Sequence, residues 1–278
     1  MTVEKLIAPP GSNLYYSLLF TEFSKKQAIV ILHNFFHELE SILNKCTSQE
    51  MALQRFQWWR GELHRIFNGT PEHPIGKLIS SILSTYPLPK IIFTELLDGI
   101  ERKWNINYYD DFGELIEDAH SSWSLLAILI SHILEKTSKE AFLLARELGL
   151  CWLITRNIRR LPWDLHQQRI LIPGILFKKN SVSPEDLKNV FTKNKKNLSC
   201  KKMLLDYLDY AKICYKRTIE STPEEIKKTQ LSSIIFTELE FSLISILEKK
   251  EFSKKQYPLY INPLRKWWLS TRLKVRNN

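Results

Sequence analysis

Residues 24–45 read SKKQAIVILHNFFHELESILNK, and the spacing of the apolar residues in this stretch decides the fold class. They recur three and four positions apart, at Ala28, Ile31, Leu32, Phe35, Leu39 and Ile42. An α-helix has about 3.6 residues per turn, so this spacing places them on one helix face. Ser24 is a residue type that caps helix N-termini, and we expect the helix to begin there. The stretch therefore predicts a long amphipathic helix with one buried face.

The same period continues outward along the rest of the chain, in which glycine is scarce. We expect further helices at about 48–67, 73–85, 89–104, 111–136, 138–160, 197–219 and 223–249, and a short helix from Ser183. Breaks are expected at Pro87, Pro89, residues 105–107, Pro162, the Pro173-Gly174 loop, Pro258 and Pro263. No repeat or long linker divides the sequence. Residues 1–278 are therefore expected to form a single all-α domain, with a helical C-terminal part at 197–278.

The chain is basic, with 40 lysines and arginines against 30 acids and a net charge of +10. The excess gathers in residues 178–202, which hold eight lysines and two acids, and in the C-terminal RKWWLSTRLKVRNN at 265–278. Such stretches attract anionic lipid or an acidic protein face, or remain a solvated surface. No nucleic-acid-binding motif accompanies the charge, so we expect no nucleic acid partner.

Cysteine usage and hydropathy predict a cytoplasmic protein that does not cross a membrane. No Cys-x-x-Cys pair is present, so free thiols of a reducing compartment are expected at Cys46, Cys151, Cys200 and Cys214. The best apolar run, residues 123–130, falls short of the roughly 18 residues that span a bilayer. The first residues, MTVEKLIAPPGSN, lack the pattern of a signal or transit peptide.

Four strings carry a resemblance to a known family. They are NLYYSLLF (13–20), HNFFHELESILNK (33–45), ALQRFQWWRGELHRIFNGTPEHPIGKLI (52–79) and RILIPGILFKKNSVSPEDL (169–187). In this order they resemble squalene/phytoene synthases, with a match from about residue 13 to 187. The WWR-x-EL and G-x-P-x-HP elements of the third string are the most specific part.

The resemblance implies an all-α, isoprenoid-synthase-type helical bundle around a central cavity, with two aspartate-rich helix segments across its mouth. In catalytic members these aspartates hold magnesium, which holds the substrate diphosphate. The family's first motif, Asp-Asp-x-x-Asp, falls here on Glu40, Ser41 and Asn44. The second, Asn-x-x-Arg-Asp-x-x-x-Asp, falls on Arg156, Arg159, Arg160 and Asp164. Most of the metal-binding carboxylates are thus absent, and Arg160 replaces one of them.

An arginine at a magnesium ligand position repels the dication, so we expect no metal cofactor and assign no catalytic residue. Our leading hypothesis is that Glu40 and Asp164 pair with Arg159 or Arg160 in an ion-pair cluster. The alternative is an anion site for a phosphate, a carboxylate or a lipid headgroup. Its candidate residues are Arg156, Arg159, Arg160 and Arg169, with Tyr15 and Tyr16, which the resemblance places at the cavity entrance.

Two further strings indicate a branch of the family. The Leu-Pro-Trp turn in NIRRLPWDLHQQRILIP (157–173) and the string YPLYINPLRKWW (257–268) resemble the branch with a mitochondrial complex I assembly factor and its proteobacterial relatives. This implies a binding or assembly role at the inner membrane face. The implied partners are a respiratory-complex subunit, an isoprenoid or an anionic lipid.

Two other readings of function stay open. The first is a head-to-head prenyl transferase that joins two isoprenyl diphosphates, which would need magnesium. The second is a peripheral membrane protein whose basic, tryptophan-rich tail docks on anionic lipid. The residues of that tail are Lys266, Trp267, Trp268, Arg272, Lys274 and Arg276.

Overall fold

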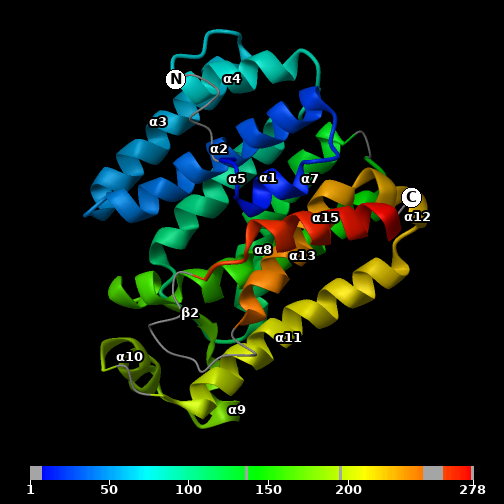
Figure 1. Cartoon of the computed structure of the whole chain (residues 1–278). Helices are drawn as coiled ribbons and strands as arrows, with labels where there is room; N and C mark the ends of the chain where they lie inside the picture. The colour runs from blue at the N-terminus through cyan, green and yellow to red at the C-terminus, as the bar shows by residue number, and fades with distance from the viewer. Residues whose placement is uncertain (1–7, 135–136, 194–195, 247–258, 277–278) are drawn as a thin grey trace.

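The computed structural model describes residues 8–134, 137–193, 196–246 and 259–276, and most of them are helical (Figure 1). The first half forms α1 (Asn13–Ser17), α2 (Phe23–Lys45), α3 (Gln49–Phe67), α4 (Pro74–Leu83), α5 (Lys90–Arg102), the 3-10 helix η2 (Lys103–Asn105), β1 (Tyr108–Tyr109), α6 (Phe112–His120) and α7 (Trp123–Ile133). The second half forms α8 (Lys139–His166), β2 (Ile170–Pro173), α9 (Gly174–Asn180), α10 (Pro184–Thr192), α11 (Leu198–Ser221), α12 (Glu224–Thr229), α13 (Leu231–Ile244) and α15 (Pro263–Arg276). The predicted all-α fold is confirmed.

Helix α8 runs through the middle of the bundle (Figure 1) and packs against α6, α7, α11 and α13. Every residue from 148 to 158 is buried, so this part of α8 has no solvent-facing side. At Gly149 a Cβ atom would overlap the backbone of Ser124, and only glycine permits this close crossing of α7 and α8. Helix α8 therefore presents polar side chains to the interior, where they need partners.

Helix α2 packs against α3, α4, α5 and α7, and its predicted apolar face is confirmed. All six residues of that face are buried: Ala28, Ile31, Leu32, Phe35, Leu39 and Ile42. The predicted cap at Ser24 is wrong, because the helix begins at Phe23 after Glu22. The Ser24 hydroxyl donates to Oε1 of Glu22 at 2.8 Å instead.

The helix expected over 111–136 is two helices, α6 and α7, which separate at Ser121 and Ser122. A Cβ atom on Gly99 of α5 would overlap the carbonyl oxygen of Ser121, so α5 lies directly against this break. The helix expected over 223–249 is also divided, at Gln230, into α12 and α13. Residues 247–249 of that expected helix and the break at Pro258 lie outside the described residues.

Pro162 does not end α8, contrary to expectation, and the helix continues to His166. A proline removes one helical N–H and strains the preceding turn. Here the last turn carries the buried side chains of Leu161 and Asp164, whose contacts with the bundle hold it in place. Tertiary packing thus outweighs the local preference.

The segment after α8 returns to the start of η2. Strand β2 pairs in parallel with β1, with Tyr108 opposite Ile170. The expected loop at Pro173-Gly174 leads directly into α9, which the sequence did not predict. The predicted start at Ser183 is confirmed, since Ser183 and Asp186 form a capping box. This pairing places Arg169 beside Trp104.

Two expectations from composition meet the structure here. All four cysteines are free, and Cys46, Cys151 and Cys200 are buried. Across the described ranges no helix is both long enough and apolar enough to cross a membrane. Residues 1–7, which entered the expectation about a targeting segment, lie outside those ranges.

Candidate functional site

Helices α2 and α8 bring the degenerate motif positions together. Arg156, Arg160 and Asp164 follow one another at four-residue spacing and form one row on α8. Glu40 and Asn44 have the same spacing on α2. The Nε atom of Arg156 lies 3.7 Å from Oε1 of Glu40, and Arg160 donates through Nη2 to Oδ1 of Asn44 at 3.2 Å. The two motif segments thus face and contact each other.

Arg156 is the centre of this contact. Its Nη1 atom donates to Oδ2 of Asp164 at 3.1 Å and to Oδ1 of the adjacent Asn157 at 3.3 Å. Arg156, Glu40 and Asp164 are all buried. Burial lowers the pKa of Arg156, but the carboxylates of Glu40 and Asp164 outweigh it and hold this pKa above its ordinary value. One guanidinium therefore bridges the two remaining carboxylates.

The predicted pairing is right in kind but assigns the wrong arginine. The bridging residue is Arg156, whereas Arg159 turns toward α13 and Arg160 contacts the amide of Asn44. The Ser41 hydroxyl donates to the carbonyl oxygen of Glu38 at 2.8 Å, so it is used within α2. Asn44 also donates to the carbonyl oxygen of Glu40 at 3.1 Å.

We call Glu40, Arg156, Arg160, Asp164 and Arg169 the arginine cluster, and positive charge is in excess there. Burial raises the pKa of Asp164, although Arg156 and Arg160 act against this rise. Burial lowers the pKa of Arg160, and the neighbouring Arg156 adds to the lowering. Burial also lowers the pKa of Arg169, which donates to the carbonyl oxygen of Trp104 at 3.4 Å. Three guanidiniums thus share two carboxylates.

Arg159 belongs to a second buried group that the sequence did not predict. It lies 3.1 Å from Oε1 of Glu240 on α13, and the same oxygen accepts from Nδ2 of Asn13 on α1 at 2.9 Å. Glu240 is buried and ties three helices together. Its acidic residue type inside the apolar stretch 231–244 was the available signal.

Tyr15 and Tyr16 lie on α1 and contact each other edge to face. The ammonium of Lys26 lies 5.1 Å from the centre of the Tyr15 ring. Tyr16 packs against the apolar cluster of Leu231, Ile235 and Leu239 on α13. The contacts that the structure gives these two tyrosines are thus with α2 and α13, and their role in ligand binding stays a prediction.

A second ion pair lies beside the arginine cluster and was also missed. Nζ of Lys103 lies 3.2 Å from Oδ1 of Asp118, and both residues are buried. The Tyr109 hydroxyl donates to Oδ2 of Asp118 at 2.5 Å. Leu115, Asp118 and Ala119 follow helical spacing in α6, so an acid on an apolar face was the signal.

The interior offers little free space near these groups. A cavity lined by Arg156, Arg169, Lys103 and Asp118 has a volume of about 10 Å³, which is room for about one water molecule. A second cavity of about 10 Å³ lies beside His33, Trp152 and Phe236. Burial lowers the pKa of His33 to about 4, so its imidazole is neutral at pH 7. The described side chains therefore fill much of the space that the resemblance assigns to a central cavity.

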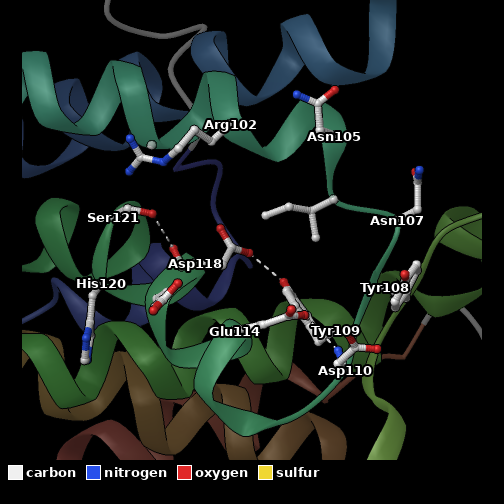
Figure 2. Close-up of a pocket in the computed structure, with 13 residues that line it drawn as sticks. Arg102, Asn105, Asn107, Tyr108, Tyr109, Asp110, Glu114, Asp118, His120 and Ser121 are labelled. Carbon is white, nitrogen blue, oxygen red and sulfur yellow. Dashed lines mark hydrogen bonds between the residues drawn. The ribbon is translucent and has the colours of Figure 1, made fainter.

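A larger cleft lies outside the Lys103–Asp118 pair. It has a volume of about 940 Å³ and runs from α5 past β1 to α6. Figure 2 shows Asp118 and Tyr109 joined at its floor, with Glu114 and Asp110 toward its rim and Arg102 on the opposite wall. Asp118 thus lies between this cleft and the arginine cluster.

The most specific string of the resemblance, WWR-x-EL and G-x-P-x-HP, forms a structural clamp. Glu62 on α3 is 0% exposed, and its Oε1 accepts from the backbone N–H groups of Glu72 and His73 at 2.9 and 2.8 Å. Its Oε2 accepts from Nε of Arg65 at 2.7 Å. A Cβ atom on Gly76 would overlap Glu62, so glycine is required where α4 meets this carboxylate. We call Glu62, Arg65, Gly76 and the backbone of residues 72–73 the Glu62 clamp.

Comparison with known proteins identifies the family. The family model described as squalene/phytoene synthase matches residues 7–239. Complex I assembly factor 6 of Bos taurus is 25% identical over 171 residues, which cover 61% of this chain and 51% of that protein. A chloroplastic phytoene synthase of Daucus carota is 19% identical over 187 residues, covering 65% and 47%. The chain thus spans about half the length of the curated relatives it matches.

Solved structures show the same fold. A dehydrosqualene synthase in complex with a ligand superposes with a TM-score of 0.76 at 14% identity, covering 95% of this chain and 91% of that one. A squalene synthase from Alicyclobacillus acidocaldarius superposes with a TM-score of 0.69 at 15% identity, covering 86% and 90%. The likeness therefore extends over the bundle as a whole.

Proposed function

The chain belongs to the squalene/phytoene synthase family, and we propose that it is a member that acts by binding, in the assembly of a respiratory complex, rather than by condensing isoprenyl diphosphates. The observation that carries this proposal is the position of Arg156. Its guanidinium lies between Glu40 and Asp164, at the place where two carboxylate-bearing helices would otherwise face each other.

This arrangement suits a guanidinium and does not suit magnesium. Magnesium needs near-octahedral oxygen ligands at about 2.0 to 2.1 Å and holds its waters strongly. Glu40 and Asp164 already share one cation, and Arg160 and Arg169 add two more positive charges nearby. Within the described ranges, no group of three or more His, Cys, Asp or Glu side chains could hold a metal ion. We infer that the chain works without a metal cofactor.

The assembly role rests on relatives. Proteins named complex I assembly factor 6 match this chain from cattle, rat, human and mouse, at 22 to 25% identity. Their matched segments cover 171 to 192 residues. On this basis we propose a role in the cytoplasm, next to the inner membrane face where a respiratory complex is built, with a subunit of that complex as the partner.

A head-to-head prenyl transferase is the second candidate. It is favoured by the coverage of the dehydrosqualene synthase structure, which includes 95% of this chain. A shared fold is weak support for shared chemistry, because chemistry depends on the side chains of the site. Under this candidate, magnesium would be required, and Glu40 and Asp164 would be the carboxylates available to it.

Catalysis separates the two candidates. The purified chain is incubated with farnesyl or geranylgeranyl diphosphate, magnesium and NADPH, and the products are extracted and identified. We expect no condensation product and no magnesium binding by calorimetry from the unmodified chain. The Ser41→Asp, Asn44→Asp, Arg160→Asp variant is the positive control for metal binding. Product from the unmodified chain would establish the transferase and contradict our proposal.

Complex assembly is tested in cells that encode the chain and a respiratory NADH dehydrogenase. After deletion of the gene, we expect assembled complex to fall severalfold on native gels and NADH oxidation by membranes to fall with it. A plasmid copy should restore both, as should a Glu40→Gln copy if no metal chemistry is involved. Unchanged complex levels in the deletion strain would remove the assembly role.

A further inference from the structure

Helix α15 lies on the surface of the bundle, across α13 and beside α1 (Figure 1). It begins at Pro263, which the sequence had suggested only as a break. Its two faces differ sharply in chemistry. The inner face fixes the helix to the body of the protein, and the outer face combines large apolar side chains with basic ones.

The inner face is held by both packing and hydrogen bonds. Leu269 and Leu273 pack against Leu231, Ile235 and Leu239 of α13. Nζ of Lys266 donates to the carbonyl oxygen of Gly11 at 2.7 Å, and Lys266 is buried. Burial lowers the pKa of this ammonium, which Glu240 partly offsets. Lys266, predicted as part of a lipid-binding tail, is thus turned inward.

The outer face exposes apolar area that the fold does not use. Leu264 is 74% exposed, Trp267 53%, Trp268 51% and Val275 71%. Leu264, Trp268 and Val275 recur at helical spacing and lie along one line of the helix. Tryptophan is favoured where an apolar layer meets water, because its ring is apolar and its indole N–H is polar.

The charges on α15 are all of one sign. Its sequence, PLRKWWLSTRLKVR, holds five basic residues and no acid. Arg265, Arg272 and Arg276 are exposed with the tryptophans. The guanidinium of Arg272 lies 5.2 Å from the centre of the Trp268 ring, so charge and aromatic surface form one patch. We call Leu264, Arg265, Trp267, Trp268, Arg272, Val275 and Arg276 the α15 outer face.

A basic cleft adjoins the C-terminal end of this helix. It has a volume of about 430 Å³, and Lys25, Lys228 and Lys274 line it, together with one acid, Glu22. Hydroxyl groups and the half-exposed ring of Phe20 complete the lining. The positive surface therefore continues from α15 onto neighbouring elements.

We propose that the α15 outer face docks on an anionic lipid bilayer, with the helix lying in the plane of the membrane surface. The apolar side chains enter the boundary between headgroups and acyl chains, and the arginines contact lipid phosphates. The single sign of charge favours an anionic membrane over an apolar protein groove. This inference goes beyond the assembly role and does not depend on it.

Vesicle sedimentation tests the proposal. The full chain is mixed with vesicles of phosphatidylcholine and phosphatidylglycerol, or of phosphatidylcholine alone. We expect binding only to the anionic vesicles, weakening as salt rises. Arg272→Glu should weaken it roughly thirtyfold, because each unit charge near an anionic surface contributes about a fivefold factor. Trp267→Ala with Trp268→Ala should weaken it roughly tenfold or more.

Matched controls separate the α15 outer face from net charge and from aromatic content. Arg55→Glu makes the same charge change at an exposed site on α3, and Trp163→Ala removes an exposed tryptophan from α8. Both should bind as the unmodified chain does. Equal losses from Arg55→Glu and Arg272→Glu, or no binding to anionic vesicles, would overturn the proposal. Displacement by inorganic phosphate beyond that by chloride of equal ionic strength would also overturn it, since it would indicate a free-anion site.

Discussion

Replacing Glu62 with alanine should lower the free energy of unfolding by about 3 to 5 kcal/mol, the usual cost of removing one partner from a buried ion pair. The carboxylate is fully buried and serves three donors, namely two backbone N–H groups at the start of α4 and the Nε atom of Arg65. Without it these donors lose their acceptor together. Urea unfolding followed by circular dichroism measures the change.

Two comparisons make this test specific to the Glu62 clamp. Glu72 lies 3.6 Å from Arg65 but is 66% exposed, so Glu72→Ala should cost less than about 1 kcal/mol. Gly76→Ala should cost about 1 to 3 kcal/mol in the unmodified chain, because the new methyl group meets Glu62. In the Glu62→Ala background this cost should largely disappear. Additive losses at positions 62 and 76 would show that the two residues do not act on each other.

Replacing Arg156 with alanine should also cost about 3 to 5 kcal/mol at pH 7, because Glu40 and Asp164 are then buried without their shared cation. The loss should be smaller at pH 5. Arg156 lowers the pKa of Asp164, so its removal raises that pKa further above the unfolded value. A group with a raised folded-state pKa takes up a proton as pH falls, and this stabilises the folded variant at low pH. Urea unfolding at both pH values measures the effect.

The control variants are Arg55→Ala and the neutralised cluster. Arg55 is exposed on α3, so its loss should change stability by less than about 0.5 kcal/mol at either pH. Adding Glu40→Gln and Asp164→Asn to Arg156→Ala should recover part of the lost stability, because no buried charge is then left unpaired. A loss below about 1 kcal/mol from Arg156→Ala would mean that Glu40 and Asp164 tolerate each other without this cation.

The helices could be predicted where one local pattern decides the outcome. The α2 face from Ala28 to Ile42 is buried as its spacing requires, and Ser183 starts α10 because its capping partners lie within the same turn. Pro162 shows the opposite case. Its local preference ends a helix, but the ion pair of Asp164 with Arg156 and the burial of Leu161 hold the turn.

The candidate site could be predicted in composition but not in pairing. The sequence placed Glu40, Arg156 and Asp164 in one region through the family resemblance. Which arginine bridges the carboxylates depends on the rotation of α8 about its axis, which spacing alone does not fix. Glu240 and Asp118 were missed because each finds its partner on another helix, at a distance along the chain that no local pattern reports.

The bond between Asn13 and Glu240 also constrains the order in which the chain can fold during synthesis. The two residues are 227 positions apart, and α1 packs against α13 and α15. At roughly 5 to 20 residues per second, a ribosome needs roughly 10 to 45 s to make the intervening chain. Throughout that time α1 has been made while its partner helices do not yet exist. The first helix to leave the ribosome is thus among the last to reach its place, and its apolar side chains stay open to chaperones until α13 emerges.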